Sequence, residues 1–259
     1  EAGSIDTDPS CGSGDGGSGD GGSGGGPLGT VVEGNYTANN SVELAALEGV
    51  TEITGTLTIS NAYVPTDLAA LYSLTRVGNG IYIGHNENLV NLNGLENLES
   101  VGGWLQLAHN PSLVNLRGLE GLHPTFVGYI SISYNDSLEN FDGLTSITQI
   151  SESFSAYHNH SLADVGGLDS LTNVGDDFIL SYHDGLTSLD ALANLTLVER
   201  NFDISSAMLL SSLTGLENLE LVGGDCTLSR NSLTSLAGLN SLEEVGGQMN
   251  VTFMDTFTS

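Results

Sequence analysis

Two histidines, His85 and His109, lie 24 residues apart and hold the same position in successive copies of a repeated pattern. Imidazoles on neighbouring copies could share a metal ion, although Tyr134 takes the next position and a third protein ligand is not evident. Rings at this spacing could also stack on an outer face without a metal, which is the simpler interpretation. The pattern leaves both open.

Three larger aromatic residues, Tyr82, Trp104 and Tyr129, fall at positions that alternate with apolar residues. In adjacent strands they would point outward and lie close together. A flat face with one aromatic patch suits ring stacking on a sugar or an interface with a protein. We therefore predict that Tyr82, Trp104, Tyr129, His85 and His109 form a binding patch for a protein or glycan ligand.

Acidic residues also recur at one position, where Glu96 and Glu120 occupy adjacent copies of the pattern. Carboxylate oxygens are the ligands that calcium prefers. These two residues are therefore the calcium candidates, although the pattern shows no metal site with a full set of protein ligands. We expect no cofactor other than such a calcium ion.

Catalytic motifs are missing from the sequence. No repeated position pairs carboxylates with a base, and no G-x-S-x-G, H-E-x-x-H or phosphate-binding glycine loop occurs in a suitable context. The two cysteines lie in different settings, which argues against a zinc site: Cys11 is in a glycine-rich segment and Cys226 replaces an apolar residue of the pattern. We predict that the protein is not an enzyme and that Cys226 is buried.

The charge balance excludes several partners. The chain has 32 Asp and Glu against 4 Lys and Arg, a formal net charge of −28. Such a chain repels phosphate backbones, so we expect no binding to nucleic acid and none to an anionic membrane surface. No run of about 18 apolar residues occurs, so we also expect no insertion into a membrane.

Two segments of different composition make up the chain. Residues 1–30 contain 12 glycines with Ser and Asp between them, which predicts a flexible tether. Residues 31–259 carry the repeats and are predicted to form one domain.

The repeats recur every 23 to 25 residues and put apolar residues in fixed columns. The first inward column contains Leu57, Ile81, Leu105, Ile130, Phe154, Phe178, Phe202, Cys226 and Met249. One such unit cannot bury its apolar face alone, whereas stacked units can, through paired strands. We predict a mainly β fold, a leucine-rich β-solenoid of about nine coils, for which the resemblance described below implies a right-handed turn.

Two other repeated positions have structural explanations. The glycines that follow a valine, such as Gly78 and Gly102, are expected at corners with positive φ. Asparagine at one turn is expected to form a ladder of hydrogen bonds between coils. That column contains Asn86, Asn110, Asn135, Asn159, His183, Ala207 and Asn231.

The pattern L-x-x-L-x-G-L-x-x-L-x-x-V-G-G-x-L-x-I-x-x-N-x-x-L, over residues 40–251, resembles the receptor L domain. That family is the leucine-rich right-handed β-helix of insulin-receptor and epidermal-growth-factor-receptor ectodomains, and related repeats occur in fungal and bacterial surface proteins. This chain lacks the cysteine-rich modules of the animal receptors. The resemblance implies a microbial protein that is secreted or displayed at the cell surface for recognition or adhesion.

The last repeat suggests an alternative role. Its apolar residues are accompanied by one charge, Asp255, and no polar cap follows them. An uncovered coil could join the opposite end of a second copy, which generates open filaments. The alternative is therefore a structural subunit of an extracellular filament or surface coat. Its assembly face would consist of Met249, Val251, Phe253, Met254 and Phe257.

Overall fold

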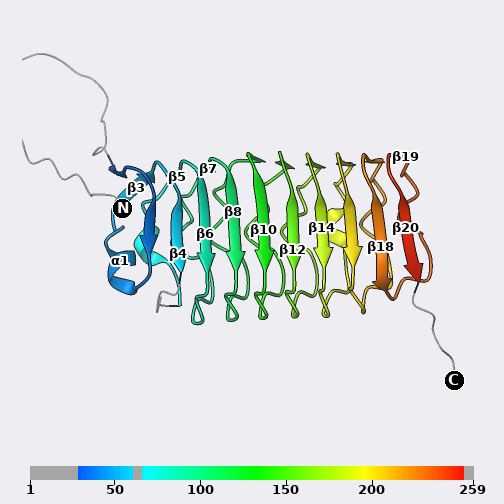
Figure 1. Cartoon of the computed structure of the whole chain (residues 1–259), viewed down its shortest axis with the longest axis horizontal. Coiled ribbons are helices and arrows are strands. Elements are labelled where there is room, and N and C mark those ends of the chain that lie inside the picture. Colours follow the sequence, from blue (N-terminus) through cyan, green and yellow to red (C-terminus); the bar gives the residue numbers. More distant parts are fainter. Residues whose placement is uncertain (1–28, 61–65, 254–259) are drawn as a thin grey trace, which may run out of the picture.

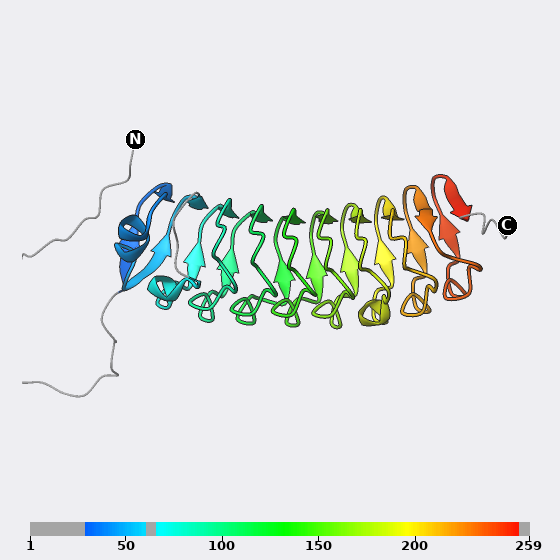
Figure 2. The ribbon, with the colours of Figure 1, turned by 90° about the horizontal axis from the view of Figure 1, so that it is seen from below.

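The computed structural model describes residues 29–60 and 66–253, which form one stack of coils. The fold is a parallel β-solenoid of about nine turns with about 24 residues per coil, as the spacing of the repeats predicted. Figures 1 and 2 show the coils arranged side by side along the long axis, each adding one strand to a continuous sheet.

Three parallel sheets run along this stack. The largest has ten strands and forms one complete face: β2 (Tyr36–Ala38), β4 (Leu57–Ser60), β6 (Gly80–Gly84), β8 (Trp104–Ala108), β10 (Tyr129–Ser133), β12 (Phe154–Tyr157), β14 (Phe178–Ser181), β16 (Phe202–Ser205), β18 (Cys226–Asn231) and β20 (Met249–Phe253).

Short strands form the other two sheets. The first contains β1 (Thr30–Val32), β3 (Val50–Ile53), β5 (Arg76–Val77) and β7 (Ser100–Val101). The second contains β9 (Thr125–Phe126), β11 (Gln149–Ile150), β13 (Asn173–Val174), β15 (Leu197–Val198), β17 (Leu221–Val222) and β19 (Glu244–Val245). The two short sheets are separated between β7 and β9, where equivalent residues are 25 rather than 24 positions apart.

Alternation along the strands of the ten-stranded sheet separates core from surface. In β4, Leu57 and Ile59 are fully buried, whereas Thr58 between them is partly exposed. The strands pair in register, so each inward residue stacks on its equivalent in the next coil. Phe154, Phe178 and Phe202 follow this rule, with ring centroids 5.4 Å apart. The core is therefore one continuous cluster built from several columns of apolar side chains along the axis of the described stack.

Glycine serves two different purposes in the coils that contain it. The glycine of the L-x-G-L turn has positive φ, for example Gly94 (112°) and Gly118 (113°). The prediction that glycines after valine need positive φ was wrong for Gly78 and Gly102, which are not in that region. There the reason is close packing, because a Cβ on Gly102 would lie 1.9 Å from the carbonyl oxygen of Gly78 in the preceding coil.

The asparagine ladder is confirmed. Asn110 donates its backbone N–H and its side-chain amide to Oδ1 of Asn135, and its amide also donates to the carbonyl of Ile83. Asn86 and Asn135 make equivalent bonds to the next coil, and all three side chains are fully buried. The ladder thus satisfies buried backbone groups between coils where the strands end.

A short helix covers the N-terminal end of the described stack. In α1 (Ser41–Ala45), Asn40 caps the first turn by accepting hydrogen bonds from the N–H groups of Val42 and Glu43. Leu44 and Leu47 pack into the core from this end. Two 3₁₀ turns, η1 (Ala69–Leu71) and η2 (Asp190–Leu192), belong to the loops of later coils. None of the helices in the described residues is long and apolar enough to cross a membrane.

Candidate ligand-binding face

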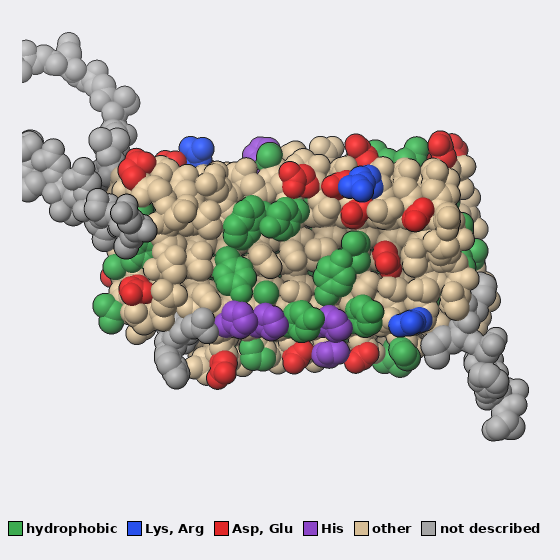
Figure 3. Space-filling view, in the orientation of Figure 1, with side chains coloured by type: hydrophobic (Ala, Val, Ile, Leu, Met, Phe, Trp, Pro, Cys, Tyr) green, Lys and Arg blue, Asp and Glu red, His purple; other side chains and the backbone are tan. Residues whose placement is uncertain are grey.

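Five rings stack in a continuous row at the end of the ten-stranded sheet, and we call this row the edge stack. Ring centroids are 4.6 Å apart for both His85–His109 and His109–Tyr134, 4.8 Å for Tyr134–His158 and 4.5 Å for His158–Tyr182. Neighbouring planes differ by at most 13°. The stacking interpretation of His85 and His109 is confirmed, and Figure 3 shows the histidines as a purple row along one border of the sheet.

The backbone explains why these rings meet. Each residue of the edge stack has a positive φ, for example 57° at both His85 and His109. The left-handed conformation is unfavourable for residues that have a side chain. It recurs at this position in seven coils, from His85 to Arg230, so other interactions must compensate for it. The following residue is held inside by the asparagine ladder, while the left-handed residue turns its side chain outward. Because the ring faces cover one another, the ring edges with their nitrogen and hydroxyl groups remain exposed to solvent.

The rings of Trp104 and Tyr82 lie against the sheet, because each covers a glycine. A Cβ on Gly80 would come within 2.2 Å of the Trp104 ring, and a Cβ on Gly84 within 2.3 Å of the Tyr82 ring. Tyr129 pairs with Trp104 in the adjacent strand, and the two rings are nearly parallel at 6.2 Å. We call Tyr82, Trp104 and Tyr129 the ring platform. The structure brings these three predicted residues together on neighbouring strands, with the edge stack along the same face.

A strip of small and polar residues separates the paired rings of Trp104 and Tyr129 from the edge stack. Tyr82 lies at one end of this strip, with its ring over Gly84, the residue before His85. Register places Gln106 beside Ser131, and Ala108 beside Ser133, in the middle of this face. The outward positions of β6, β8, β10 and β12 contain no Asp, Glu, Lys or Arg. The chain has a net charge of −28, yet these four strands have no charged outward side chain. Figure 3 shows green side chains gathered there and red ones outside it.

An open pocket of 340 Å³ lies against the edge stack, lined by His85, Glu87, His109, Pro111, Tyr134 and Asp136. Two imidazoles and two carboxylates therefore share one hollow. Even so, the described residues contain no group of three or more His, Cys, Asp or Glu arranged to hold a metal ion. The geometry accounts for the two histidines as ring-stacking residues with polar edges.

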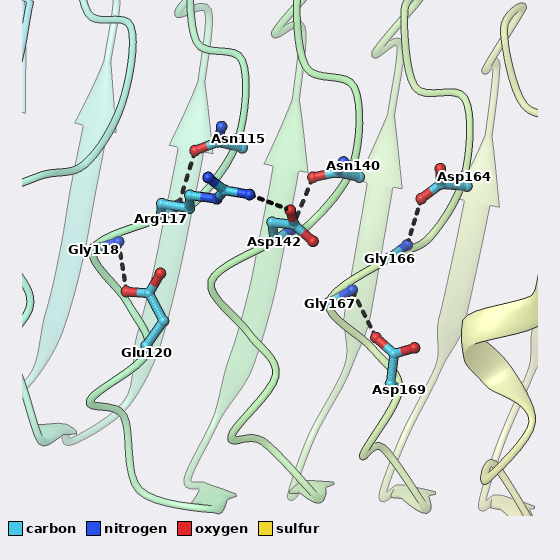
Figure 4. A network of polar contacts seen from close by, with 10 residues as sticks. All are labelled: Asn115, Arg117, Gly118, Glu120, Asn140, Asp142, Asp164, Gly166, Gly167 and Asp169. Atoms are coloured by element: carbon cyan, nitrogen blue, oxygen red, sulfur yellow. Dashed lines mark hydrogen bonds and ion pairs between the residues drawn. The ribbon is translucent and has the colours of Figure 1, made fainter.

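The calcium candidates Glu96 and Glu120 have a local structural role. Glu120 accepts a hydrogen bond from the N–H of Gly118 at 2.7 Å, and Glu96 accepts one from Gly94 at 2.8 Å. Figure 4 shows Glu120 beside Gly118 and, two coils on, Asp169 in the same relation to Gly167. The acidic column thus caps the left-handed glycine turns of the coils. Calcium binding by these residues stays a prediction.

Sequence reasoning missed a second polar group on the face, around Asp203 in β16. Burial raises the pKa of this carboxyl, although hydrogen bonds from Ser205 and Ser181 act in the opposite direction. Its Oδ1 is buried and has no partner in the described structure. Burial, then Asp203 and Asp177, raise the pKa of Tyr157. The uncharged part of the face therefore ends at β16, where Asp203 is the one carboxylate at an outward strand position of the described sheet. The Asp at this position of the outward column is the signal that could have indicated it.

The remaining predicted residues have mixed outcomes. Cys226 is confirmed as a buried free cysteine, and burial raises the pKa of its thiol to about 11. Of the assembly face, Met249 is 39% exposed and Val251 packs partly against the core. Phe253 ends β20. Met254, Phe257, Cys11 and nearly all of the tether lie outside the described residues.

Comparison with known proteins adds no family to this description. No family model matches the chain, and no curated protein matches it. The geometry of the face, together with the solenoid that displays it, is the basis for assigning a function.

Proposed function

We propose that this protein is a non-catalytic recognition or adhesion module, secreted or displayed at the cell surface, that binds its ligand on the outer face of the ten-stranded sheet. One observation carries the proposal. An acidic chain keeps the outward positions of four adjacent strands uncharged and places flat aromatic rings on them. An aromatic, uncharged and continuous surface is characteristic of interaction sites.

The resemblance of the repeats to receptor L domains supports the same proposal. It implies a right-handed leucine-rich helix and an extracellular setting, and the leucine columns agree with such a coil. The solenoid holds every outward position at a fixed place relative to its neighbours, so the face is preorganised for binding.

Adhesion of protein-coated beads tests this function. We expect beads that carry the wild-type protein to adhere to at least one of four surfaces: cellulose, chitin, collagen or fibronectin. The double variant Tyr82→Ala/Trp104→Ala should lose adhesion by about tenfold or more, as expected for aromatic anchors. Tyr72→Ala is the matched control, because Tyr72 is 63% exposed in a loop outside this sheet. Equal adhesion of all three proteins, or none by the wild type, contradicts the proposal.

The alternative role, a subunit of a filament or coat, rests on the C-terminal end of the described stack. Leu236 is 38% exposed there, whereas its equivalent one coil earlier, Leu213, is fully buried. At the opposite end Val42 of α1 is 77% exposed. Each end therefore has an exposed apolar side chain, and two different ends in contact would extend indefinitely.

Sedimentation velocity over a range of concentrations distinguishes this alternative. If copies join end to end, the wild type should form species that grow with concentration. Leu236→Asp should then remain monomeric, because the charge would be buried in the contact. Val42→Asp tests the opposite end in the same way. Monomers of the wild type at high concentration exclude the filament role.

A further inference from the structure

We infer that the ligand of this face is an extended glycan without acidic groups, lying across the strands along the solenoid axis between the paired rings of Trp104 and Tyr129 and the edge stack. This inference deepens the proposed recognition function and rests on it. It commits to one class of ligand, where the proposed function leaves protein and glycan open.

The two kinds of aromatic residue offer complementary contacts. Trp104 and Tyr82 lie against the sheet over Gly80 and Gly84, so they can present ring faces to a ligand. The edge stack presents ring edges instead, with imidazole nitrogens and tyrosine hydroxyls that form hydrogen bonds. A pyranose has an apolar C–H face and a rim of hydroxyl groups. Ring faces on one side and polar edges on the other match both parts of such a unit.

The spacing along the axis favours a repeating ligand. Successive rings of the edge stack lie 4.5 to 4.8 Å apart, which is the spacing of the coils. This interval is close to the length of one sugar unit in an extended chain. Between the two borders, Gln106 and Ser131 are paired in neighbouring strands and offer an amide and a hydroxyl one coil apart, with Ser133 two residues further along β10. A chain along the axis would thus meet a ring of the edge stack at each step and these polar groups at two of them.

The surface is less suited to a protein anchor. Side chains that dominate protein interfaces insert into well-packed apolar pockets. Here the middle of the face is a strip of Gln, Ser and Ala on a regular sheet, and the pocket beside the edge stack contains Glu87 and Asp136. These carboxylates, with Asp177 and Asp203 further along the sheet, repel uronic acids and sulfated sugars. The ligand class that remains is a neutral or amine-bearing glycan.

Trp104 reports on binding directly, since it is the single tryptophan. We expect its fluorescence to change with at least one of four hexamers: β-1,4-glucose, β-1,3-glucose, β-1,4-N-acetylglucosamine or β-1,4-glucosamine. Affinity should increase from the dimer to the hexamer, because each added unit reaches another coil. A hexamer of galacturonic acid should bind about tenfold more weakly or not at all. Comparing the glucosamine hexamer with the hexamers that have no amine separates electrostatic attraction to the carboxylates from stacking on the aromatic rings.

Variants measured by calorimetry locate the ligand. Gly80→Ala should weaken binding about tenfold, since the new methyl group displaces the Trp104 ring, and circular dichroism should show an intact fold. His109→Ala should also weaken it, whereas Tyr72→Ala should not. An affinity independent of chain length, or unaffected by both Gly80→Ala and His109→Ala, overturns the inference. If no hexamer binds while bead adhesion to a protein still depends on Trp104, the glycan assignment fails and the recognition function stands.

Discussion

Phe178→Ala should lower the free energy of unfolding by about 3 to 5 kcal/mol, the range for removing a buried phenylalanine. The side chain is fully buried, and its ring stacks between Phe154 and Phe202 at 5.4 Å on either side. The backbone ladder of β14 prevents the coils from closing the resulting cavity, so the loss should fall at the upper end of this range.

Ile179→Ala is the control for this change. Ile179 is the next residue of the same strand but faces outward and is partly exposed. It should cost less than about 1 kcal/mol, because little apolar area leaves the core. Urea unfolding followed by circular dichroism measures both variants. If Ile179→Ala costs as much as Phe178→Ala, the assignment of core and surface in this strand is wrong.

Acid should remove about 3 kcal/mol of stability through His183, at the standard value of about 1.4 kcal/mol per pKa unit. His183 is fully buried in the asparagine ladder, and burial lowers its pKa from 6.5 to about 4. Its Nε2 lies 3.1 Å from the carbonyl of Ala156 and its Nδ1 accepts from the N–H of Asn159. A neutral ring with the proton on Nε2 satisfies both bonds.

The direction in which stability changes with pH follows from proton binding by the folded and unfolded chains. Below pH 6.5 the unfolded chain takes up a proton at this histidine, whereas the folded chain does so only near pH 4. Stability from His183 is therefore complete above pH 6.5 and is lost as the pH falls to about 4. The difference in unfolding free energy between wild type and His183→Asn should change by about 3 kcal/mol between pH 7 and 4.

Asparagine is the suitable replacement, because the ladder uses it in the neighbouring coils, as at Asn159 and Asn135. Taking the difference between two proteins cancels the titration of the many carboxylates. His123→Asn, the same substitution at an exposed histidine, is the matched control. A constant difference between wild type and His183→Asn from pH 7 to 4 would show that His183 is not held neutral by the fold.

The candidate site was accessible to sequence reasoning only in part. A period of about 24 residues assigns each residue to a column, and alternation decides which columns face inward. This was sufficient to place Tyr82, Trp104 and Tyr129 on neighbouring strands and to stack His85 on His109.

The sequence by itself therefore determined the solenoid, its core columns, the asparagine ladder and the aromatic patch on neighbouring strands, because burial in a repeat depends on position within the period. Only the tertiary structure decided how those side chains lie. The left-handed backbone of the edge stack, the rings of Trp104 and Tyr82 over glycines, and the capping role of Glu120 each depend on atoms close in space. Backbone conformation and ring orientation are set by these neighbours, most of them one coil away, and a residue's own column does not specify them.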